Sequence, residues 1–527
     1  MSDPDAAILA GIDAQEYRRR VRAWVLYDWA NSGFATTIMA AVLPVYYSQV
    51  AGSSLGSAAS ATAVWSAGLS ISLLVSASLS PLLGTISDIK RSKKRFLAFF
   101  CGLGVVSTTL LVLVQSGDWL LASALFILGR IGFTAANTFY DAMLPHVARG
   151  EDRHRVSAQG YAAGYLGGGL LLAIDLLLIW ALPGNWGARL SFLSVALWWA
   201  LFSIPLLRRV PEPQTATARG NPGDSVLRLS FQRLGETIKD MRRYRELFKG
   251  LLAILLYADG IGTLIGMAAI YGAELGFGGA ELLLALLLVQ FAAIPYSLIF
   301  GRLPDPAEKR RPFFLAFILF NAIALPLLGI AGSRLLPSFS GGISLAGAGS
   351  ILGSILLVQA LGLILAWILG PRLLSGLSRR MDARNGILLA LGIYILIATW
   401  GYFLHTVVEF WCLAWLVAVV QGGTQALSRS LFSSLAPASK SGEFFGLFGV
   451  MEKFAAILGP LLFSMAALLL GSSRPAVLSV IVFFVAGGLL LRRVDIAAGM
   501  RAAQAEDAQQ LEALHGRIGE TGDGWQT

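Results

Sequence analysis

The hydrophobic positions of this chain do not alternate with polar ones as in a strand or an amphipathic helix. They form long apolar blocks divided by short polar segments. A helix needs about 20 apolar residues to cross the hydrocarbon core of a bilayer, and most blocks reach that length. Continuous apolar runs favour helices over a membrane barrel, whose strands alternate lipid-facing and lumen-facing residues. The pattern predicts an all-α integral membrane protein with about 14 transmembrane helices.

The apolar blocks give approximate bounds for the predicted spans. They run near 23–48, 63–83, 96–115, 119–145, 157–182, 187–207, 247–275, 281–301, 312–331, 349–369, 385–404, 409–436, 445–471 and 474–493. We expect a cytoplasmic linker at 209–246, between a bundle of about six helices within 1–208 and one of about eight within 247–493. The segment 227–248 has helical periodicity and is expected to lie along the membrane surface. Residues 494–527 are expected to form a cytoplasmic tail.

Composition and charge agree with a bilayer as the main partner. The chain is 56% hydrophobic and 14% charged, whereas soluble domains carry about 25% charged residues. The net charge of +10 does not indicate nucleic acid, because the cations lie in short loops between apolar blocks. They gather in alternate loops, such as 88–95 and 149–155, whereas 51–62 has none. This alternation predicts an even number of spans with both termini in the cytoplasm.

Five local motifs occur in a fixed order along the chain. They are Tyr27–Phe34 (YDWANSGF), Phe139–Pro145 (FYDAMLP), Tyr257–Thr263 (YADGIGT), Gln421–Ser430 (QGGTQALSRS) and Glu443–Gly446 (EFFG). Together, over most of 20–490, they resemble the branch of the major facilitator superfamily that includes the autophagy-related vacuolar amino-acid effluxer and its bacterial relatives. The resemblance implies the two-bundle fold and secondary active transport by alternating access. It also implies a small organic substrate, amino acids exported with proton coupling being the first candidate, and a bacterial inner membrane.

The second half of the chain departs from the family pattern of six helices per bundle. Leu287–Gln290 (LLVQ) is followed eleven residues later by Gly301, and Leu356–Gln359 (LLVQ) is followed eleven residues later by Gly370. We interpret the segment at roughly 304–372 as an inserted helical hairpin. Local duplication of the preceding span would explain the repeat, and chance matching of leucine-rich helices is the alternative.

Two loop motifs resemble the elements that close the inward gate in the superfamily. After the second span the chain reads Gly84–Asp88 (GTISD), and the corresponding loop of the second half reads Gly301–Asp305 (GRLPD). A glycine allows close helix approach, and a carboxylate can cap or pair with the neighbouring bundle. On the basis of this resemblance, we expect Gly84, Asp88, Gly301 and Asp305 to have the gating role. The alternative is an ordinary polar turn in each loop.

Ionisable side chains at membrane depth cost a few kcal/mol each, so each is a candidate site. Asp28 and Asn31 share one face of the first span, and Asp259 lies in the corresponding helix of the second half. A repeat relating the two bundles would place Asp28 and Asp259 at equivalent positions, where either could couple transport to protons. Alternatively, Asp28 is a residue at the start of its helix.

The later helices add further candidates for binding or coupling. In span four, Arg130 is expected to pair with Asp28 or Asp175, while Asn137 and Tyr140 could line a polar cavity. The remaining candidates are Gln421, Gln425 and Arg429 near the end of one helix, with Glu452 and Lys453 in the next. The alternative for all of these is a structural ion pair that holds helices together.

Three functions remain open from the sequence. The leading one is a carrier of small solutes, followed by a lipid or lysolipid carrier and by a non-transporting assembly factor or sensor. No nucleotide-binding loop, metal-ligand spacing or nucleophile motif is present in the sequence. We therefore expect neither an ATP-driven pump nor an enzyme, and no cofactor.

Overall fold

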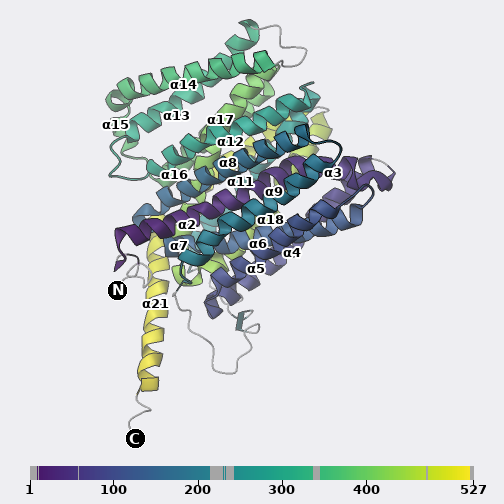
Figure 1. Ribbon diagram of the computed structural model, residues 1–527. Helices are drawn as coiled ribbons and strands as arrows, with labels where there is room; N and C mark the ends of the chain where they lie inside the picture. Colours follow the sequence, from purple (N-terminus) through teal and green to yellow (C-terminus); the bar gives the residue numbers. More distant parts are fainter. Residues whose placement is uncertain are drawn as a thin grey trace.

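The computed structural model describes residues 9, 11–56, 58–213, 229–230, 232, 243–335, 345–470 and 473–522. Its described part is helical and forms two bundles (Figure 1). The first contains α2 (Ala14–Gly33), η1 (Phe34–Ala41), α3 (Val42–Gln49), η2 (Ala51–Leu55), α4 (Ala58–Lys90), α5 (Lys93–Leu110), η3 (Leu111–Leu113), α6 (Trp119–Ala142), α7 (Leu144–Val147), η4 (Gly150–Asp152), α8 (Arg153–Ala181) and α9 (Trp186–Arg209).

The second bundle follows the linker, most of which lies outside the described residues, as does most of the amphipathic helix predicted at 227–248. Its elements are α11 (Arg245–Glu274), α12 (Gly279–Arg302), α13 (Arg311–Leu335), α14 (Leu345–Leu373), α15 (Ser375–Ser378), α16 (Ala383–Tyr402), α17 (Val407–Leu435), η7 (Ala438–Lys440), α18 (Ser441–Leu470), α19 (Ser473–Ser479), α20 (Ile481–Arg492) and the tail helix α21 (Ile496–Gly522).

Each bundle has its own hydrophobic core. Trp24 and Trp199 are fully buried in the core of the first bundle, and Trp411 and Tyr394 in that of the second. The bundles meet where α4 packs against α18 and where α8 packs against α12 and α17. Nearly all of α17 is buried, so this helix forms the centre of the molecule.

Among the described residues, twelve helices are long and apolar enough to cross a membrane. Two further helices would complete the predicted set of 14. One starts at α2 and is interrupted by the π-helical turns of η1, and the other is α18. The count of 14 therefore stays a prediction. The observed bounds lie close to the predicted ones. The main difference is that α2 begins at Ala14, before the predicted start near residue 23. Asp13 caps the helix, and its first turns are polar and precede the apolar block.

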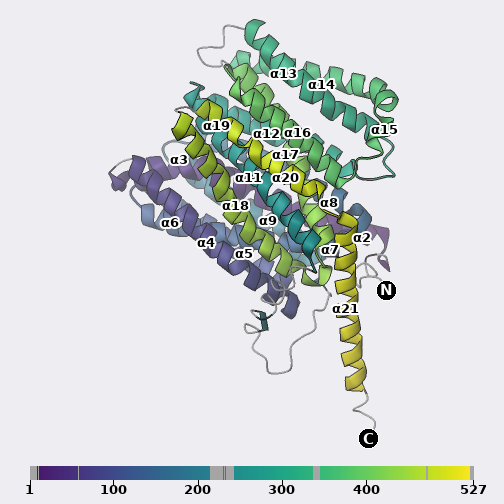
Figure 2. The same ribbon diagram turned by 180° about the vertical axis from the view of Figure 1, so that it is seen from behind.

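The segment interpreted as an insertion forms the pair α13 and α14 at one edge of the molecule, as Figures 1 and 2 both show. α13 packs on α14 and on α17. A buried polar cluster joins the pair to the bundle: the Tyr296 hydroxyl donates to Gln359 Oε1 at 2.7 Å, and Gln359 Nε2 donates to Asn321 Oδ1 at 2.7 Å. These three residues come from α12, α14 and α13, so the cluster fixes the relative positions of three helices.

The tail helix α21 projects from one end of the molecule (Figures 1 and 2), and this end is called the α21 side below. The buried carboxylate of Asp507 accepts hydrogen bonds from the backbone N–H groups of Ala438 and Ser439 at 3.0 and 2.9 Å. Glu506 pairs with Lys440 at 2.9 Å and with Arg243 at 2.7 Å. α21 therefore holds the turn η7, which leads directly into α18.

Candidate functional site

A cavity of about 310 Å³ lies between the two bundles. Helices α2, α6 and α8 and the turns of η1 contribute one wall, and α12 and α17 contribute the other. The lining residues are Asp28, Asn31, Ser32, Ala35, Thr36, Phe133, Asn137, Tyr140, Asp141, Tyr161, Gly164, Tyr165, Gln290, Gln421, Gln425 and Arg429. Most of these side chains are polar, although they lie on helices that are otherwise rich in apolar residues.

Arg429 on α17 lines the cavity and binds the first bundle with all of its donors. Its two terminal nitrogens donate to Asp28 Oδ2, each at 3.1 Å, and one of them also donates to Asp141 Oδ1 at 3.1 Å. The remaining donors reach the Ser157 hydroxyl at 2.9 Å and the Ser157 carbonyl at 2.8 Å. A guanidinium has five N–H donors, so the side chain is fully occupied.

Aromatic rings surround the same guanidinium. Its central carbon lies 4.2 Å from the ring centre of Tyr161, 4.9 Å from that of Trp24 and 5.6 Å from that of Tyr140. Such contacts stabilise a cation that has been removed from water. Ring stacking of Trp24 on Tyr140, with centroids 4.4 Å apart, fixes the rings in turn. The arginine is thus held in one place by charge, hydrogen bonds and aromatic faces.

Asp28, the partner of Arg429 in this ion pair, also lines the cavity. The Tyr140 hydroxyl donates to Asp28 Oδ2 at 2.8 Å, so Oδ2 accepts three hydrogen bonds. Within the described part of the chain, no hydrogen bond occupies the second oxygen, Oδ1. Further along the wall, Asn31 donates to Asn137 at 2.5 Å. Across the cavity, Tyr165 donates to Gln425 at 2.7 Å, which joins α8 to α17.

The structure brings together most of the residues predicted to carry transport. The cavity contains Asp28, Asn31, Asn137, Tyr140, Gln421, Gln425 and Arg429. Arg130 lies outside the lining, and its predicted pairing is wrong. Asp28 binds Arg429 instead, and Asp175 accepts hydrogen bonds from Thr37 at 2.8 Å and Ser194 at 2.5 Å. The side chains of Glu452 and Lys453 lie outside the described part of the structure.

Asp259 does not occupy a position equivalent to that of Asp28 in the cavity. Its Oδ2 accepts a hydrogen bond from the backbone N–H of Gly459 at 2.8 Å, where α11 meets α18. A Cβ atom at position 459 would collide with Thr263, so the glycine permits this contact. The helix face that carries Asp259 is turned toward its own bundle, and the expected symmetry fails for that reason.

Sequence reasoning missed the contribution of α8. Ser157, Tyr161 and Tyr165 follow one another at i, i+4 and i+8, and therefore share one helix face. Ser157 binds Arg429, and both tyrosines line the cavity. The spacing of polar and aromatic residues in an otherwise apolar helix was a signal for this face. Gln290, noticed only for its repeated LLVQ context, also lines the cavity.

On the α21 side, Asp88 at the end of α4 contacts the start of α18. Its carboxylate accepts hydrogen bonds from the N–H groups of Gly442 at 3.1 Å and Glu443 at 2.8 Å, and it pairs with Lys93. Anions are stabilised at a helix N-terminus, where the first N–H groups lack helical partners. Gly84 allows the approach, because a Cβ there would collide with the Gly442 carbonyl.

The corresponding loop of the second half, Gly301–Asp305, only partly resembles the Gly84–Asp88 loop. Gly301 packs against α8, where a Cβ would collide with Ala158. Asp305, however, is exposed and accepts a hydrogen bond from the N–H of Ala307 in its own turn at 2.9 Å. The chain turns at Pro304 before it can reach α8. Instead, His154 Nδ1 and the Ser430 hydroxyl lie 2.7 Å apart, and Arg153 donates to the Ser433 carbonyl at 3.2 Å.

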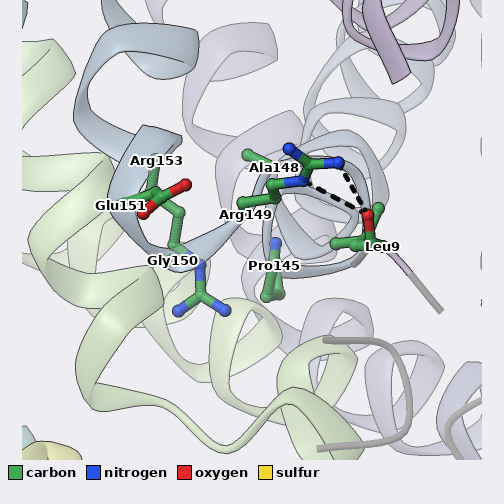
Figure 3. A pocket seen from close by; sticks show the side chains of 7 residues that line it. All are labelled: Leu9, Pro145, Ala148, Arg149, Gly150, Glu151 and Arg153. Atoms are coloured by element: carbon green, nitrogen blue, oxygen red, sulfur yellow. Dashed lines mark hydrogen bonds between the residues drawn. The ribbon is translucent and has the colours of Figure 1, made fainter. Parts of the chain in front are cut away.

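A second hollow, of about 370 Å³, lies on the α21 side beside α7 and η4 (Figure 3). Two hydrogen bonds from Arg149 to the Leu9 carbonyl, at 3.2 and 3.1 Å, cross its rim. The Arg149 guanidinium also lies 4.4 Å from the ring centre of Tyr17. All of its lining residues belong to the first half of the chain, so this hollow does not lie on a path between the bundles.

Comparison with known proteins agrees with this architecture. The family described as vacuole effluxer Atg22 like matches residues 16–341 and 350–504. The chain belongs to this Atg22-like family. The matched residues include most of α13 and α14, so the edge helices lie within the family region.

Among the relatives of this Atg22-like chain, the uncharacterized MFS-type transporter YxiO of Bacillus subtilis is 34% identical over 90% of this chain and 95% of its own length. Autophagy-related protein 22 of Kluyveromyces lactis is 23% identical over 80% of this chain and 76% of its own. A solved structure of the proton:xylose symporter XylE, 15% identical, matches with a TM-score of 0.59 over 94% of this chain and 99% of its own. The Atg22-like chain is therefore a membrane transporter with the major facilitator fold, and not an enzyme.

Proposed function

We propose that this protein is a secondary active transporter that moves small polar organic solutes by alternating access, with amino acids as the first class to test. The observation that carries the proposal is the polar cavity between the bundles, whose walls come from both halves of the chain. A solute bound there contacts both bundles at once. Rocking of one bundle against the other would then expose the solute to either side of the membrane.

The contacts between the halves on the α21 side support the assignment of an inner gate. Arg429 binds Asp28, Asp88 binds the start of α18, and His146 Nε2 lies 3.0 Å from the Ser441 hydroxyl. In this proposal, these contacts form the gate between the cavity and the α21 side. The basic loop at 90–95 lies next to Asp88 on the same side, which supports a cytoplasmic orientation of α21 and of both termini. The inner membrane is the proposed location.

We assign proton coupling to Asp28 rather than to Asp259, because Asp28 lies in the cavity and contacts the gate arginine. The groups that face it are Tyr140 and Asp141 from α6, Tyr161 from α8 and Arg429 from α17. Protonation of Asp28 would remove the charge that holds Arg429, so proton binding and opening of the gate would be linked. Export is the direction suggested by the effluxer relatives.

Ligand-dependent thermal unfolding tests the proposal. The purified protein would be screened against amino acids, short peptides and lysolipids at pH 6 and pH 8, because a ligand that binds the folded state raises the unfolding temperature. We expect stabilisation by amino acids that is lost in Asp28→Asn and kept in Glu308→Gln, a residue outside the cavity. Stabilisation by lysolipids alone would support a lipid carrier. An unchanged unfolding temperature with every compound would support a non-transporting protein.

A further inference from the structure

A second carboxylate, that of Asp175, is buried in the first bundle outside the lining of the central cavity. It lies on α8, and none of its surface is exposed. Its Oδ2 accepts a hydrogen bond from the Thr37 hydroxyl at 2.8 Å, and its Oδ1 accepts one from the Ser194 hydroxyl at 2.5 Å. In the described part of the chain, these two neutral donors act on the carboxylate and no cation pairs with it. An ionisable residue of this kind within a membrane span is a candidate for proton binding.

Asp175 and Asp28 lie at different depths of the same bundle. Asp28 lies against Gly160 of α8, since a Cβ atom at position 160 would collide with Asp28 Oδ2. Asp175 follows Gly160 on the same helix after four turns, about 22 Å further along its axis. Because α8 begins on the α21 side with Arg153, Asp175 lies toward the opposite side of the membrane.

The contact with Thr37 reaches an irregular part of the cavity wall. Thr37 lies in the π-helical turns of η1, where its carbonyl accepts from the N–H of Val42. The preceding residue, Thr36, lines the cavity and donates its hydroxyl to the Ser32 carbonyl of its own helix at 3.1 Å. Thr37 instead donates to another helix, α8. π-helical turns are rare and occur mostly at functional sites, so this contact links Asp175 to a segment that shapes the cavity.

The hydrogen bonds around Asp175 accommodate a proton on one oxygen. The Ser194 hydroxyl has a second acceptor, the Ser191 carbonyl at 2.8 Å. When a proton binds to Oδ1, the new O–H can donate to Ser194 Oγ, whose own hydrogen turns to the Ser191 carbonyl. The bond from Thr37 changes more, because a hydrogen bond to a neutral oxygen is about half as strong as one to a carboxylate. Proton binding therefore weakens the link to η1.

The other ionisable groups on the helices packed around α8 and η1 have partners elsewhere. Those toward the same side of the membrane are Arg189 on α9, which donates to the Val112 carbonyl, Glu281 on α12, which accepts from the Gly278 N–H, Glu409 on α17, which accepts from the Thr406 N–H, and Tyr46 on α3, which donates to the Val114 carbonyl. Toward the α21 side, Asp28 pairs with Arg429, and Tyr165 donates to Gln425. A change of charge at Asp175 is thus felt mainly by Thr37 and Ser194.

We propose that Asp175 is a proton-binding site in the half of the first bundle away from α21, and that its negative charge holds η1 in place. Proton binding releases Thr37 and loosens the segment that carries Thr36 into the cavity. The site is separate from Asp28. The inference goes beyond the proposed function, because it concerns the first bundle whichever solute is carried.

Infrared difference spectra of the purified full-length protein between pH 9 and pH 5 test proton binding. We expect a carboxylic acid C=O band that grows as the pH falls and is missing from the spectra of Asp175→Asn. Thr37→Val removes a partner but keeps the carboxyl, so this band should still titrate. Identical spectra of wild type and Asp175→Asn over this range would overturn the assignment.

Hydrogen exchange in residues 34–42 tests the link to η1. After correction for the intrinsic pH dependence, exchange in the wild type should be on the order of fivefold faster at pH 5 than at pH 9, because a hydrogen bond to a charged group is the stronger one. Asp175→Asn and Thr37→Val should exchange at the faster rate at both pH values. Thr109→Val is the matched control, since Thr109 donates within its own helix to the Val105 carbonyl at 2.8 Å. It should keep the wild-type pH dependence.

The outcomes are independent of the ligand test of the proposed function, because no transported solute is used. A pH-dependent exchange that is lost in both Asp175→Asn and Thr37→Val supports the inference. Exchange that does not change with pH in the wild type, or that changes equally in Thr37→Val, would contradict the link between Asp175 and η1. Either result leaves the transport proposal to its own experiment.

Discussion

Arg429 and Asp28, 401 positions apart in the chain, are joined by two hydrogen bonds of 3.1 Å between the two bundles. Both side chains are largely removed from solvent, with 5% and 12% of their area exposed. A buried ion pair is stable only when its geometry is good and its remaining hydrogen-bonding groups are satisfied, as they are for Arg429. The pair therefore belongs to one conformation of the protein, the one in which the bundles meet on the α21 side.

Breaking this pair should destabilise the closed arrangement. In Arg429→Gln, Asp28 and Asp141 lose their shared cation, and loss of one partner of a buried pair typically costs about 3–5 kcal/mol. We expect a lower unfolding temperature and loss of ligand-induced stabilisation. The double variant Asp28→Asn with Arg429→Gln should recover part of the stability but not the binding. A wild-type melting curve for Arg429→Gln would contradict the assignment.

Asp88 should hold the gate on the α21 side through the amides of Gly442 and Glu443. Asp88→Asn removes a charge from a helix N-terminus, where such a charge contributes about 0.3–2 kcal/mol. The population should shift toward a state open on the α21 side. Spin labels placed on the ends of α4 and α18 would report a longer distance in the variant. Asp305→Asn is the matched control, because Asp305 lies in an exposed turn, and it should leave the distance unchanged.

The tail helix should make the stability of this end depend on pH. Burial alone would raise the pKa of Glu506, but the hydrogen bond and charge of Lys440 hold this pKa below its ordinary value. Glu506 then stabilises the fold above its unfolded pKa of about 4.3, and this contribution is lost as the pH falls through the folded pKa. Unfolding followed from pH 7 to pH 3 should show a smaller loss in Glu506→Gln than in the wild type. Identical pH curves would exclude this role for Glu506.

The polar cluster of Tyr296, Asn321 and Gln359 should fix α13 and α14 to the second bundle. Gln359→Leu leaves a buried tyrosine hydroxyl and amide short of a partner, which costs about 1–3 kcal/mol. A double-mutant cycle with Tyr296→Phe should give a coupling energy well above zero. Additive effects of the two substitutions would show that the cluster does not hold the helices together.

The sequence predicted the helices well and the pairing of side chains poorly. Span length depends on local hydropathy, so α12 and α17 begin and end within a few residues of their predicted bounds. The partner of Asp28, in contrast, depends on how two bundles dock, and no local signal in the motif YDWANSGF identifies Arg429. Symmetry between the halves suggested that Asp259 would match Asp28 and that Asp305 would match Asp88. Asp259 instead contacts α18 in its own bundle, and Asp305 lies in an exposed turn.

The transport claim is tested most directly by counterflow in proteoliposomes that contain the purified protein. Vesicles loaded with unlabelled amino acids would be diluted into the labelled compound, and its uptake followed with time. A carrier whose cavity contains Asp28 should accumulate label only in loaded vesicles, with the signal lost in Asp28→Asn and retained in Glu308→Gln. Absence of counterflow for every solute that binds, or equal counterflow in Asp28→Asn, would contradict the account.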